Sequence, residues 1–402
     1  MTSPRPVPPH FRKPLLETPF SERARELQQN DHFVAWAGYS TVDVFTTVEQ
    51  EYFAVRNATT LYDLTPMVKY RITGPDAERF LNRLVTRDVR RLKAGRVSYV
   101  VWCNDAGHII DDGTIFRLGA QDFRVCTAER QLDWFADSAL GFDVAIEEVT
   151  SEIAALAVQG PTSCFVLKRF GLAGLERLRP FELAEFTVGG RPLMASRTGF
   201  TGDLGYELWM RPEHALAVWD ELLAAGQTRG IRPIGSQALN MARIEAGFLL
   251  PNVDFVSAEH TIRVHRERTP LELGLGWLVE FDKPHFNGRR ALLAQRERGL
   301  ERLLVGLDVA GNKPAHNALL YAEAAGRREV GSVTSAMWSP TCKRNIALAI
   351  IEAPYFALGT TVWADIYLNR ELVWERRMAA AQVVERPFFA PERRRATPPA
   401  DR

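Results

Sequence analysis

The arrangement of strand-like and helix-like segments changes near residue 300, and this change constrains the fold more than any other feature of the sequence. Before it, short segments of both kinds are intermixed. After it, the runs at 303–309, 330–334, 346–351 and 361–367 are all strand-like and are separated by turns, which predicts a small all-β C-terminal domain. The earlier strands do not alternate with helices of about 10–15 residues, as a doubly wound parallel sheet requires. The sequence therefore predicts an α+β fold.

Two similar units of strand, Gly-Pro turn and helix occur in the first part of the chain. Val68–Ile72 alternates as a half-buried strand does, and Gly74-Pro75 then opens a predicted helix that runs through Arg83. Ala154–Val158 is predicted to be a second strand, and Gly160-Pro161 opens a second helix. Proline is tolerated in the first turn of a helix because its missing N–H would have no helical partner there. The two units suggest a duplicated building block.

Two further helices are predicted over 212–225 and 236–246, where apolar residues recur at helical spacing. Ser236 is the predicted N-cap of the second helix and Gly247 its predicted stop. At the ends of the chain, we expect residues 1–20 to form a flexible arm. Residues 389–402, which are rich in proline and arginine, are expected to form a solvated tail.

Composition and missing motifs argue against several classes of protein. The chain has 50 Lys and Arg against 49 Asp and Glu, a net charge of +1, whereas proteins that bind nucleic acid mainly through charge carry a basic excess. No stretch approaches the roughly 18–20 apolar residues of a membrane span. The four cysteines include no Cys-x-x-Cys pair, so we expect reduced, mostly buried thiols in a cytoplasmic protein. No metal-ligand spacing, phosphate loop or dinucleotide fingerprint occurs, and we expect no metal site.

A pair of carboxylates follows a predicted turn. The segment 104–107 has turn chemistry, and Asp111 and Asp112 stand in the strand-like segment after it. Neighbouring residues of a strand point to opposite faces, so one of the two aspartates must point into the protein or into a cleft. A buried carboxylate is costly unless it is paired or functional. The plain alternative is that one aspartate caps the hairpin turn and the other is solvated.

A glycine-rich segment, 197–208, contains a carboxylate near its end. Its three glycines let the backbone wrap closely around a ligand or form a tight hairpin. Glu207 follows in an otherwise apolar strand. Its carboxylate could accept two parallel N–H bonds from a guanidine-like edge, such as a 2-amino-pyrimidinone ring. The alternative is a plain hairpin with a salt-bridged Glu207.

Arg243 stands near the end of the predicted helix 236–246, in the segment Ala242-Arg243-Ile244-Glu245-Ala246-Gly247. It lies one turn after Leu239, so it could project from a packed face. The alternative is an arginine that only complements the negative end of the helix dipole.

These three segments, in this order, resemble the T-protein of the glycine cleavage system, a folate-dependent aminomethyltransferase, and its wider family. The family's Gly-Gly-x-x-Asp-Asp, Thr-Gly-Tyr-Thr-Gly-Glu-x-Gly-Tyr/Phe-Glu and Arg-Leu-Glu-Ala-Gly segments stand here as Gly107–Asp112, Thr198–Glu207 and Arg243–Gly247. Gly276-Trp277 and Phe286–Arg289 are further matches, and the resemblance covers roughly residues 40 to 388.

The resemblance implies three domains in a cloverleaf around a central hole that binds tetrahydrofolate, with antiparallel sheets and a C-terminal β-barrel. It divides the chain into a folate-binding region of two interleaved domains over 21–285, a connector over 286–300 and the barrel over 301–388. Asp112 would be the catalytic carboxylate beside the reacting nitrogens of folate. Tyr99, Glu207 and Arg243 would bind the cofactor, with Glu207 clamping the pterin.

The sequence departs from the family pattern on the donor side of the implied site. Pro66 stands where the family has a histidine, and the segments 233–238 and 250–254 also differ. The donor is therefore left open between an aminomethyl group on a lipoyl carrier protein and a small methylated amine, sulfonium or methoxy compound. An alternative of another class is a non-catalytic folate-binding protein. The Lys-Gly-Cys-Tyr signature of the related iron–sulphur assembly factors is absent, because no cysteine stands between Cys164 and Cys342.

Overall fold

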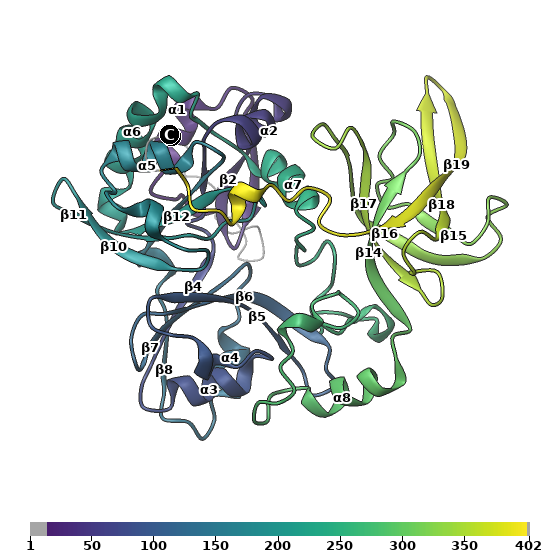
Figure 1. Ribbon diagram of the computed structural model, residues 1–402, viewed down its shortest axis with the longest axis horizontal. Coiled ribbons are helices and arrows are strands. Elements are labelled where there is room, and N and C mark those ends of the chain that lie inside the picture. Colours follow the sequence, from purple (N-terminus) through teal and green to yellow (C-terminus); the bar gives the residue numbers. More distant parts are fainter. Residues whose placement is uncertain (1–13, 400–402) are drawn as a thin grey trace, which may run out of the picture.

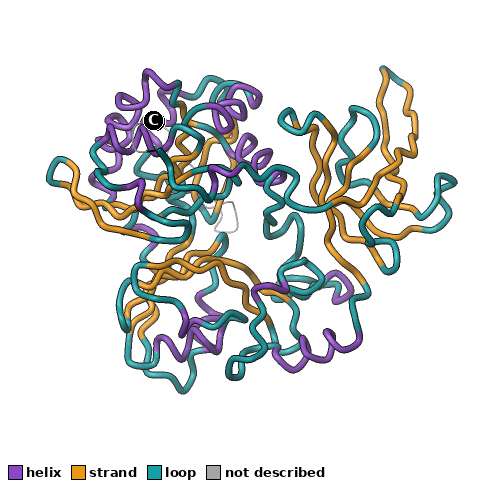
Figure 2. Tube along the Cα trace, in the orientation of Figure 1, coloured by secondary structure: helices purple, strands orange, loops and turns teal. Residues whose placement is uncertain are grey.

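The structure is a computed structural model and describes residues 14–399. Three units lie around a common centre (Figure 1). They are built on a six-stranded sheet, a five-stranded sheet and a closed barrel. Helices belong mostly to the first two units, and the third consists of strands and loops (Figure 2). The predicted α+β cloverleaf with a C-terminal barrel is confirmed.

The first unit is a sheet covered by helices. Its strands have the order β10-β11-β12-β9-β3-β13, and the short β13–β3 pair is the parallel one. The strands are β3 (Thr60–Asp63), β9 (Ala154–Gln159), β10 (Leu183–Val188), β11 (Arg191–Ser196), β12 (Gly205–Met210) and β13 (Arg232–Pro233). The helices are α1 (Ser21–Leu27), α2 (Val48–Asn57), α5 (Ser163–Phe170), α6 (Ala215–Gly226) and α7 (Ser236–Glu245). A hairpin of β1 (His32–Trp36) and β2 (Tyr39–Val44) completes the unit.

The second unit is an antiparallel sheet with the order β5-β6-β7-β4-β8. Its strands are β4 (Val68–Thr73), β5 (Arg96–Cys103), β6 (Ile109–Arg117), β7 (Asp122–Thr127) and β8 (Ala145–Glu148). Helices α3 (Ala77–Leu84) and α4 (Leu132–Ser138) cover one face of it. The expected connector, 286–300, contains a helix, α8 (Arg289–Arg298), and the N–H of Asn287 donates to the carbonyl of Arg83 (3.1 Å).

The third unit is a closed six-stranded barrel with the order β14-β17-β16-β15-β18-β19. Its strands are β14 (Arg302–Val309), β15 (Leu319–Tyr321), β16 (Glu329–Ser339), β17 (Arg344–Glu352), β18 (Thr361–Arg370) and β19 (Val373–Val384). Val305, Leu307 and Val309 of β14 are buried in the barrel interior. The four strand-like runs that the sequence indicates after residue 300 correspond to β14, β16, β17 and β18.

Both units of strand, Gly-Pro turn and helix are present, as β4 to α3 and β9 to α5. Gly160, which joins the second pair, has φ +119°, and a Cβ there would lie 2.3 Å from the carbonyl oxygen of Ala58. Gly247 has φ +67° after α7, which confirms the predicted stop. The predicted N-cap at Ser236 was wrong. Gly235 holds that position, because a Cβ at Gly235 would lie 2.1 Å from the carbonyl oxygen of Asp43.

The C-terminal residues differ from the solvated tail that we expected. They return from the barrel across α7 to the first unit (Figure 1), where Arg393 pairs with Asp203 at 2.6 Å. The Asp203 carboxylate has no solvent exposure, so it needs a nearby cation. At the other end, residues 1–13 of the predicted arm lie outside the described residues. Leu16, in the described part of that arm, donates a backbone hydrogen bond from its N–H to the carbonyl of Gly38 (2.9 Å).

Among residues 14–399, no helix is both long enough and apolar enough to cross a membrane. Within the same residues, no group of three or more His, Cys, Asp or Glu side chains is arranged to hold a metal ion. All four cysteines are free, and three of them are buried. The cytoplasmic location stays a prediction.

Candidate active site

The sheets of the first two units face each other. Phe116 on β6 and Trp209 on β12 make an edge-to-face contact with ring centroids 5.1 Å apart. Both belong to one buried cluster that includes Tyr62 of β3, Val97 of β5 and Ala157 of β9. Side chains alternate between the two faces along a strand. Residues two positions from Phe116 or Trp209 along these strands therefore also face the layer between the sheets.

The inner face of the second sheet carries Tyr99, Asp112 and Cys126. The register pairs Tyr99 of β5 with Thr114 of β6, and Thr114 with Cys126 of β7. Paired residues of neighbouring strands lie on the same face. Asp112, Thr114 and Phe116 follow one another at two-residue steps along β6, so all of these side chains face β12.

Asp112 is in direct contact with Tyr99, whose hydroxyl donates a hydrogen bond to Oδ2 of the carboxylate. Both residues are partly exposed. Asp111 lies on the opposite face, where it is 2% exposed and accepts a hydrogen bond from Nε2 of Gln131 (3.1 Å). Asp111 therefore points into the second unit's own core, and Asp112 points toward the facing sheet.

The two aspartates also differ in their electrostatics. Burial raises the pKa of Asp112 to about 6, and the hydrogen bond from Tyr99 opposes that rise. Burial and the charge of Asp112 raise the pKa of Asp111 well above its usual range, and the same two causes raise the pKa of Tyr99. Near neutral pH, Asp112 thus carries the charge of the pair and Tyr99 remains a proton donor. No cation within residues 14–399 pairs with Asp112, so its carboxylate can stabilise positive charge on a ligand.

Glu207 lies on β12, two positions from Trp209, and so faces the same layer from the other side. Its side chain is 9% exposed and accepts a hydrogen bond from the Thr198 hydroxyl (2.5 Å). Burial raises its pKa to about 7. Burial also raises the pKa of the Cys126 thiol to about 12, and the charge of Glu207 adds to that rise. Glu207 therefore lies near Cys126, on the face that carries Asp112.

The residues beside Tyr99 include two that the sequence did not single out as binding residues. Trp277 packs obliquely on Tyr99, with ring centroids 6.2 Å apart, and is 61% exposed. The guanidinium of Arg87 lies 5.6 Å from the centre of the Trp277 ring. An exposed indole beside a carboxylate offers a surface on which a planar ligand can stack. The Gly276-Trp277 match was a signal for the tryptophan, but nothing in the sequence indicated Arg87.

Arg243 lies apart from these residues, on α7 where the helix meets the barrel. Its side chain is 1% exposed. It donates to Asp254 (2.5 Å), Ser335 (2.8 Å), Asn240 (2.8 Å) and the carbonyl of Phe248 (3.1 Å). Burial lowers its pKa, against the effect of Asp254. These acceptors tie α7 to β16 of the barrel, and a contact of Arg243 with folate stays a prediction.

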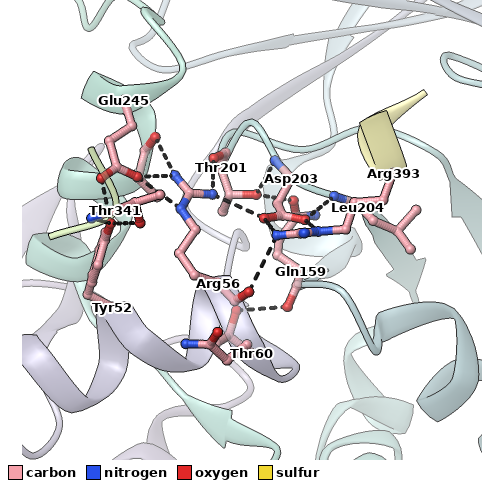
Figure 3. A network of polar contacts seen from close by, with 12 residues as sticks. Tyr52, Arg56, Thr60, Gln159, Thr201, Asp203, Leu204, Glu245, Thr341 and Arg393 are labelled. Carbon is pink, nitrogen blue, oxygen red and sulfur yellow. Dashed lines mark hydrogen bonds and ion pairs between the residues drawn. The ribbon is translucent and has the colours of Figure 1, made fainter. Parts of the chain in front are cut away.

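Buried charges fix the segment 197–207, which carries Glu207 (Figure 3). Arg56 of α2 donates to Glu245 of α7 through Nη2 (2.7 Å) and reaches Asp203 through Nη1 (3.4 Å). Arg393 binds the same carboxylate of Asp203 through Nε (2.6 Å) and Nη2 (2.8 Å). The segment is thus held from the C-terminal residues and from α2, whose Arg56 is itself fixed by Glu245 of α7.

The structure brings Tyr99 and Asp112 together and places Glu207 on the sheet that faces them. The arrangement offers a cation-free carboxylate on each of two facing sheets, with an exposed indole at the side. Such a layer can hold a flat, nitrogen-rich ring by its edge and place a carboxylate next to its nitrogens.

Comparison with known proteins shows the family to which the fold belongs. Residues 23–283 match the family model for the GCVT N-terminal domain, and residues 302–390 match the glycine cleavage T-protein C-terminal barrel domain. The crystal structure of the glycine cleavage system aminomethyltransferase T from Bartonella henselae superimposes with a TM-score of 0.81 at 26% identity. It covers 94% of this chain and 98% of that chain.

Similar sequences include enzymes with two different names. An aminomethyltransferase of Caldanaerobacter subterraneus subsp. tengcongensis is 33% identical over 366 residues, which are 90% of this chain and 92% of that protein. The trimethylamine-oxide aldolase of Ruegeria pomeroyi is 36% identical over 374 residues, which are 89% of this chain but 46% of that longer protein. The chain belongs to the glycine cleavage T-protein family.

Proposed function

We propose that this chain transfers a one-carbon unit from a small methylated or aminomethylated donor to tetrahydrofolate. That it is an enzyme, a folate-dependent one-carbon transferase, follows from the two matched family domains and the aminomethyltransferase relatives. The observation that supports the site most strongly is the pairing of Asp112 with Tyr99 on a sheet face opposite Glu207.

The residues between the sheets fit a reduced pterin. Glu207 is a nearly buried carboxylate whose pKa is raised to about 7, and no cation within residues 14–399 compensates it. An amino-pyrimidinone edge carries two adjacent N–H donors, which would satisfy both oxygens of an ionised Glu207. Trp277 provides an exposed indole face near Asp112 for a planar ligand.

Each residue has a distinct task in the proposed reaction. Tetrahydrofolate supplies the nucleophilic nitrogens that accept the one-carbon unit. The bond between that unit and the donor heteroatom breaks, and the donor leaves with the electron pair and takes up the proton that the nitrogen loses. Asp112 orients those nitrogens and stabilises the positive charge that develops on them. The hydroxyl of Tyr99 holds Oδ2 of Asp112 in place. Glu207 fixes the orientation of the ring, so that the reacting edge lies toward Asp112.

A methylated amine is the donor class that we favour. The aldolase of Ruegeria pomeroyi is 36% identical over the matched part, against 33% for the aminomethyltransferase, and its name refers to a methylated amine oxide. Pro66 also replaces the histidine of true T-proteins. An aminomethyl group on a lipoyl carrier protein is the second candidate, supported by the aminomethyltransferase relatives.

A donor screen tests this proposal. The purified chain is incubated with tetrahydrofolate and, in separate reactions, with methylated amines, amine oxides, sulfonium compounds, methoxy-aromatics and an aminomethylated lipoyl carrier protein. We expect one class to yield methyl- or methylene-folate, detected by mass, and we expect Asp112→Asn to yield none. Folate binding without product from any class would favour the non-catalytic alternative.

A further inference from the structure

The C-terminal residues form a strap that connects the barrel to the first unit. After β19 the chain crosses α7, and residues 385–399 reach the first unit (Figure 1). On the way, the N–H groups of Phe388 and Phe389 both donate to the carbonyl of Glu245, at 2.9 Å and 3.0 Å. We call residues 385–399 the C-terminal strap.

The strap holds the segment 197–207 at its start and near its middle. Near the start of the segment, Nη2 of Arg197 donates to the carbonyl of Ala396 (2.6 Å). Further along, the guanidinium of Arg393 donates two parallel hydrogen bonds, of 2.6 Å and 2.8 Å, to the carboxylate of Asp203. Two-pronged guanidinium–carboxylate pairs of this kind fix direction as well as distance.

A third contact acts through an aromatic pair. Arg394 of the strap lies over the ring of Phe248 at 5.1 Å. Phe248 stacks in turn on Phe200, within the segment, with ring centroids 5.5 Å apart and planes 23° from parallel. The strap therefore touches the segment directly at Arg197 and Asp203, and it reaches Phe200 through Phe248.

Only the end of the held segment, Gly205–Glu207, belongs to a strand; residues 197–204 before it lie outside helices and strands. The segment contains three glycines, and Gly202 has φ +70° with its Cα against Ala246, where an added Cβ would lie 2.4 Å from the Ala246 Cβ. Glycine-rich backbone loses more entropy than other backbone when it is ordered. Thr198, the hydroxyl partner of Glu207, directly follows Arg197. Ordering by the strap therefore extends to the proposed pterin clamp.

Asp203 is the point at which the strap acts most directly. Its carboxylate has no exposure, while the Arg393 side chain is 39% exposed. The other cation near it, Arg56, is 3.4 Å away and makes its shorter bond, 2.7 Å, to Glu245. Arg393 is thus the nearer of the two cations, and it comes from the part of the chain that follows the barrel.

We propose that Arg393 is a positioning residue for folate: through Asp203 it orders the segment 197–207 and so presets Glu207. The inference rests on the proposed function, because it assigns the strap to the pterin clamp of that same site. A segment that is already ordered loses no further conformational entropy when the ligand binds. Its order therefore raises the affinity of the protein for folate. Asp112 lies on the other sheet, so the chemical step itself should be insensitive to Arg393.

The test compares Arg393→Ala, Arg393→Lys and the matched control Arg395→Ala. Arg395 is exposed, and its side chain makes no hydrogen bond, ion pair or ring contact with residues 14–399. Tetrahydrofolate binding is measured by calorimetry, and KM for tetrahydrofolate and kcat are measured with the donor found in the screen. We expect Arg393→Ala to raise Kd and KM about ten-fold or more with kcat at saturating folate little changed. Arg393→Lys should recover part of the affinity, and Arg395→Ala should match the wild type.

Two outcomes would overturn the inference. One is an unchanged Kd in Arg393→Ala. The other is a parallel loss of kcat and of folded protein, which indicates a purely structural contact. Should Arg393→Ala not fold, Arg393→Lys decides, because it keeps the charge and loses the two-pronged geometry. Wild-type protein that fails to bind tetrahydrofolate refutes the proposed function instead, so the two failures are distinguishable.

Discussion

Two neighbouring aspartates receive different properties from the strand that carries them. Asp111 is turned into the core of the second unit, and its pKa is raised well above its usual range. Asp112 is turned toward the opposite sheet, where the pKa is raised to about 6 and Tyr99 donates to it. The alternation of a β-strand thus separates a neutral structural carboxyl from a charged one that a ligand can reach.

Replacing Asp112 with asparagine tests that division of roles. Asp112→Asn keeps the size of the side chain and removes its charge. We therefore expect turnover to fall by about 10²–10⁴-fold while tetrahydrofolate binding is largely kept. Steady-state assays and calorimetry measure the two effects. Asp105→Asn, in the exposed turn before β6, is the matched control and should behave as wild type. Wild-type turnover in Asp112→Asn contradicts its catalytic role.

Glu207 makes the free energy of unfolding depend on pH. Its folded-state pKa is raised from 4.5 to about 7, so the folded chain keeps a proton that the unfolded chain has already lost. Stability therefore falls as pH rises from about 4.5 to about 7 and stays lower above that range. Glu207→Gln removes this loss. We expect it to stabilise the ligand-free protein by about 1–3 kcal/mol more at about pH 8 than at about pH 4.

Urea unfolding of wild type and Glu207→Gln at the two pH values measures the difference. Asp220→Asn is a suitable control, because that surface carboxylate pairs with Arg23 and its pKa is lowered. Its effect should have the opposite dependence on pH. A pH-independent effect of Glu207→Gln would mean that folding does not raise the pKa of Glu207.

The sequence identified Asp112 and Glu207 because charged residues in apolar strands stand out. It missed the buried lysine of β4. Lys69 has no exposure, burial lowers its pKa to about 8, and Nζ donates to the carbonyl of Thr65 (2.6 Å). Simple alternation around Lys69 predicts a solvated side chain. Lys69 is paired with Cys126 on the inner face, which the first unit covers, so both faces of β4 are buried, and a local pattern cannot reveal that.

At the scale of elements, glycine decides where a strand turns into a helix. Gly74 and Gly160 occupy the same place in their two units and have φ values of +122° and +119°. Both lie against backbone, since an added Cβ would come within 2.6 Å of Asp143 O and 2.3 Å of Ala58 O. The Gly-Pro pairs therefore mark turns that only glycine can make.

Gly160→Ala should destabilise the protein by more than the cost of a left-handed backbone alone. The new Cβ would lie 2.3 Å from the carbonyl oxygen of Ala58, and φ is +119°. We expect a loss of about 2–4 kcal/mol in the free energy of unfolding. Gly141→Ala is the matched control, because φ is also positive there, +84°, but nothing lies within 4 Å. It should cost about 1 kcal/mol. Equal losses in denaturant unfolding would contradict the steric account.

The elements that the sequence indicated were those with strong local patterns, such as β14 and β17. Two barrel strands were not singled out. β15 is three residues long, and β19 begins with exposed residues, among them Val373 at 67% and Trp374 at 69% exposure. The strap was also missed, because the triple arginine 393–395 is typical of a solvated tail unless a buried carboxylate such as Asp203 is known to face it.

At the scale of the whole molecule, one buried network of charges surrounds the segment 197–207. It joins α2 and α7 of the first unit to the barrel and to the C-terminal strap. The Tyr52 hydroxyl and the Ser339 hydroxyl of the barrel both donate to Glu245 at 2.5 Å, and Arg56 links Glu245 to Asp203 (Figure 3). The network connects the barrel to the first unit. Arg393 of the strap extends it by binding Asp203.

Arg56→Met should therefore be strongly destabilising. It removes one cation from between two carboxylates that are both without exposure, Asp203 and Glu245. We expect a loss of about 3–5 kcal/mol, because the remaining charges stay buried. The control is Arg23→Met, whose pair with Asp220 is 27% and 48% exposed and should contribute about 0–1 kcal/mol. Similar losses of stability for the two variants in calorimetric unfolding would contradict this expectation. They would mean that water solvates the Asp203 and Glu245 carboxylates once Arg56 is gone.

The cloverleaf arrangement could be predicted only through resemblance. Composition and periodicity gave α+β with a β C-terminal domain, but they did not show that β6 and β12 lie on facing sheets. That proximity depends on the register of strands far apart in the sequence, in which Asp112 and Glu207 are separated by 95 positions (207 − 112). Arg243 was grouped with them by motif, whereas its side-chain hydrogen bonds go to Asn240, Phe248, Asp254 and Ser335.

Calorimetric titration of tetrahydrofolate into wild type, Asp112→Asn and Glu207→Gln tests the central claim most directly, because it asks whether the two facing carboxylates hold a reduced pterin. We predict saturable binding at one site in the wild type and nearly equal affinity in Asp112→Asn. Glu207→Gln should bind more weakly by about 1–3 kcal/mol, as expected for a lost charge-assisted hydrogen bond. No binding to the wild type, or the same affinity in all three proteins, would contradict it.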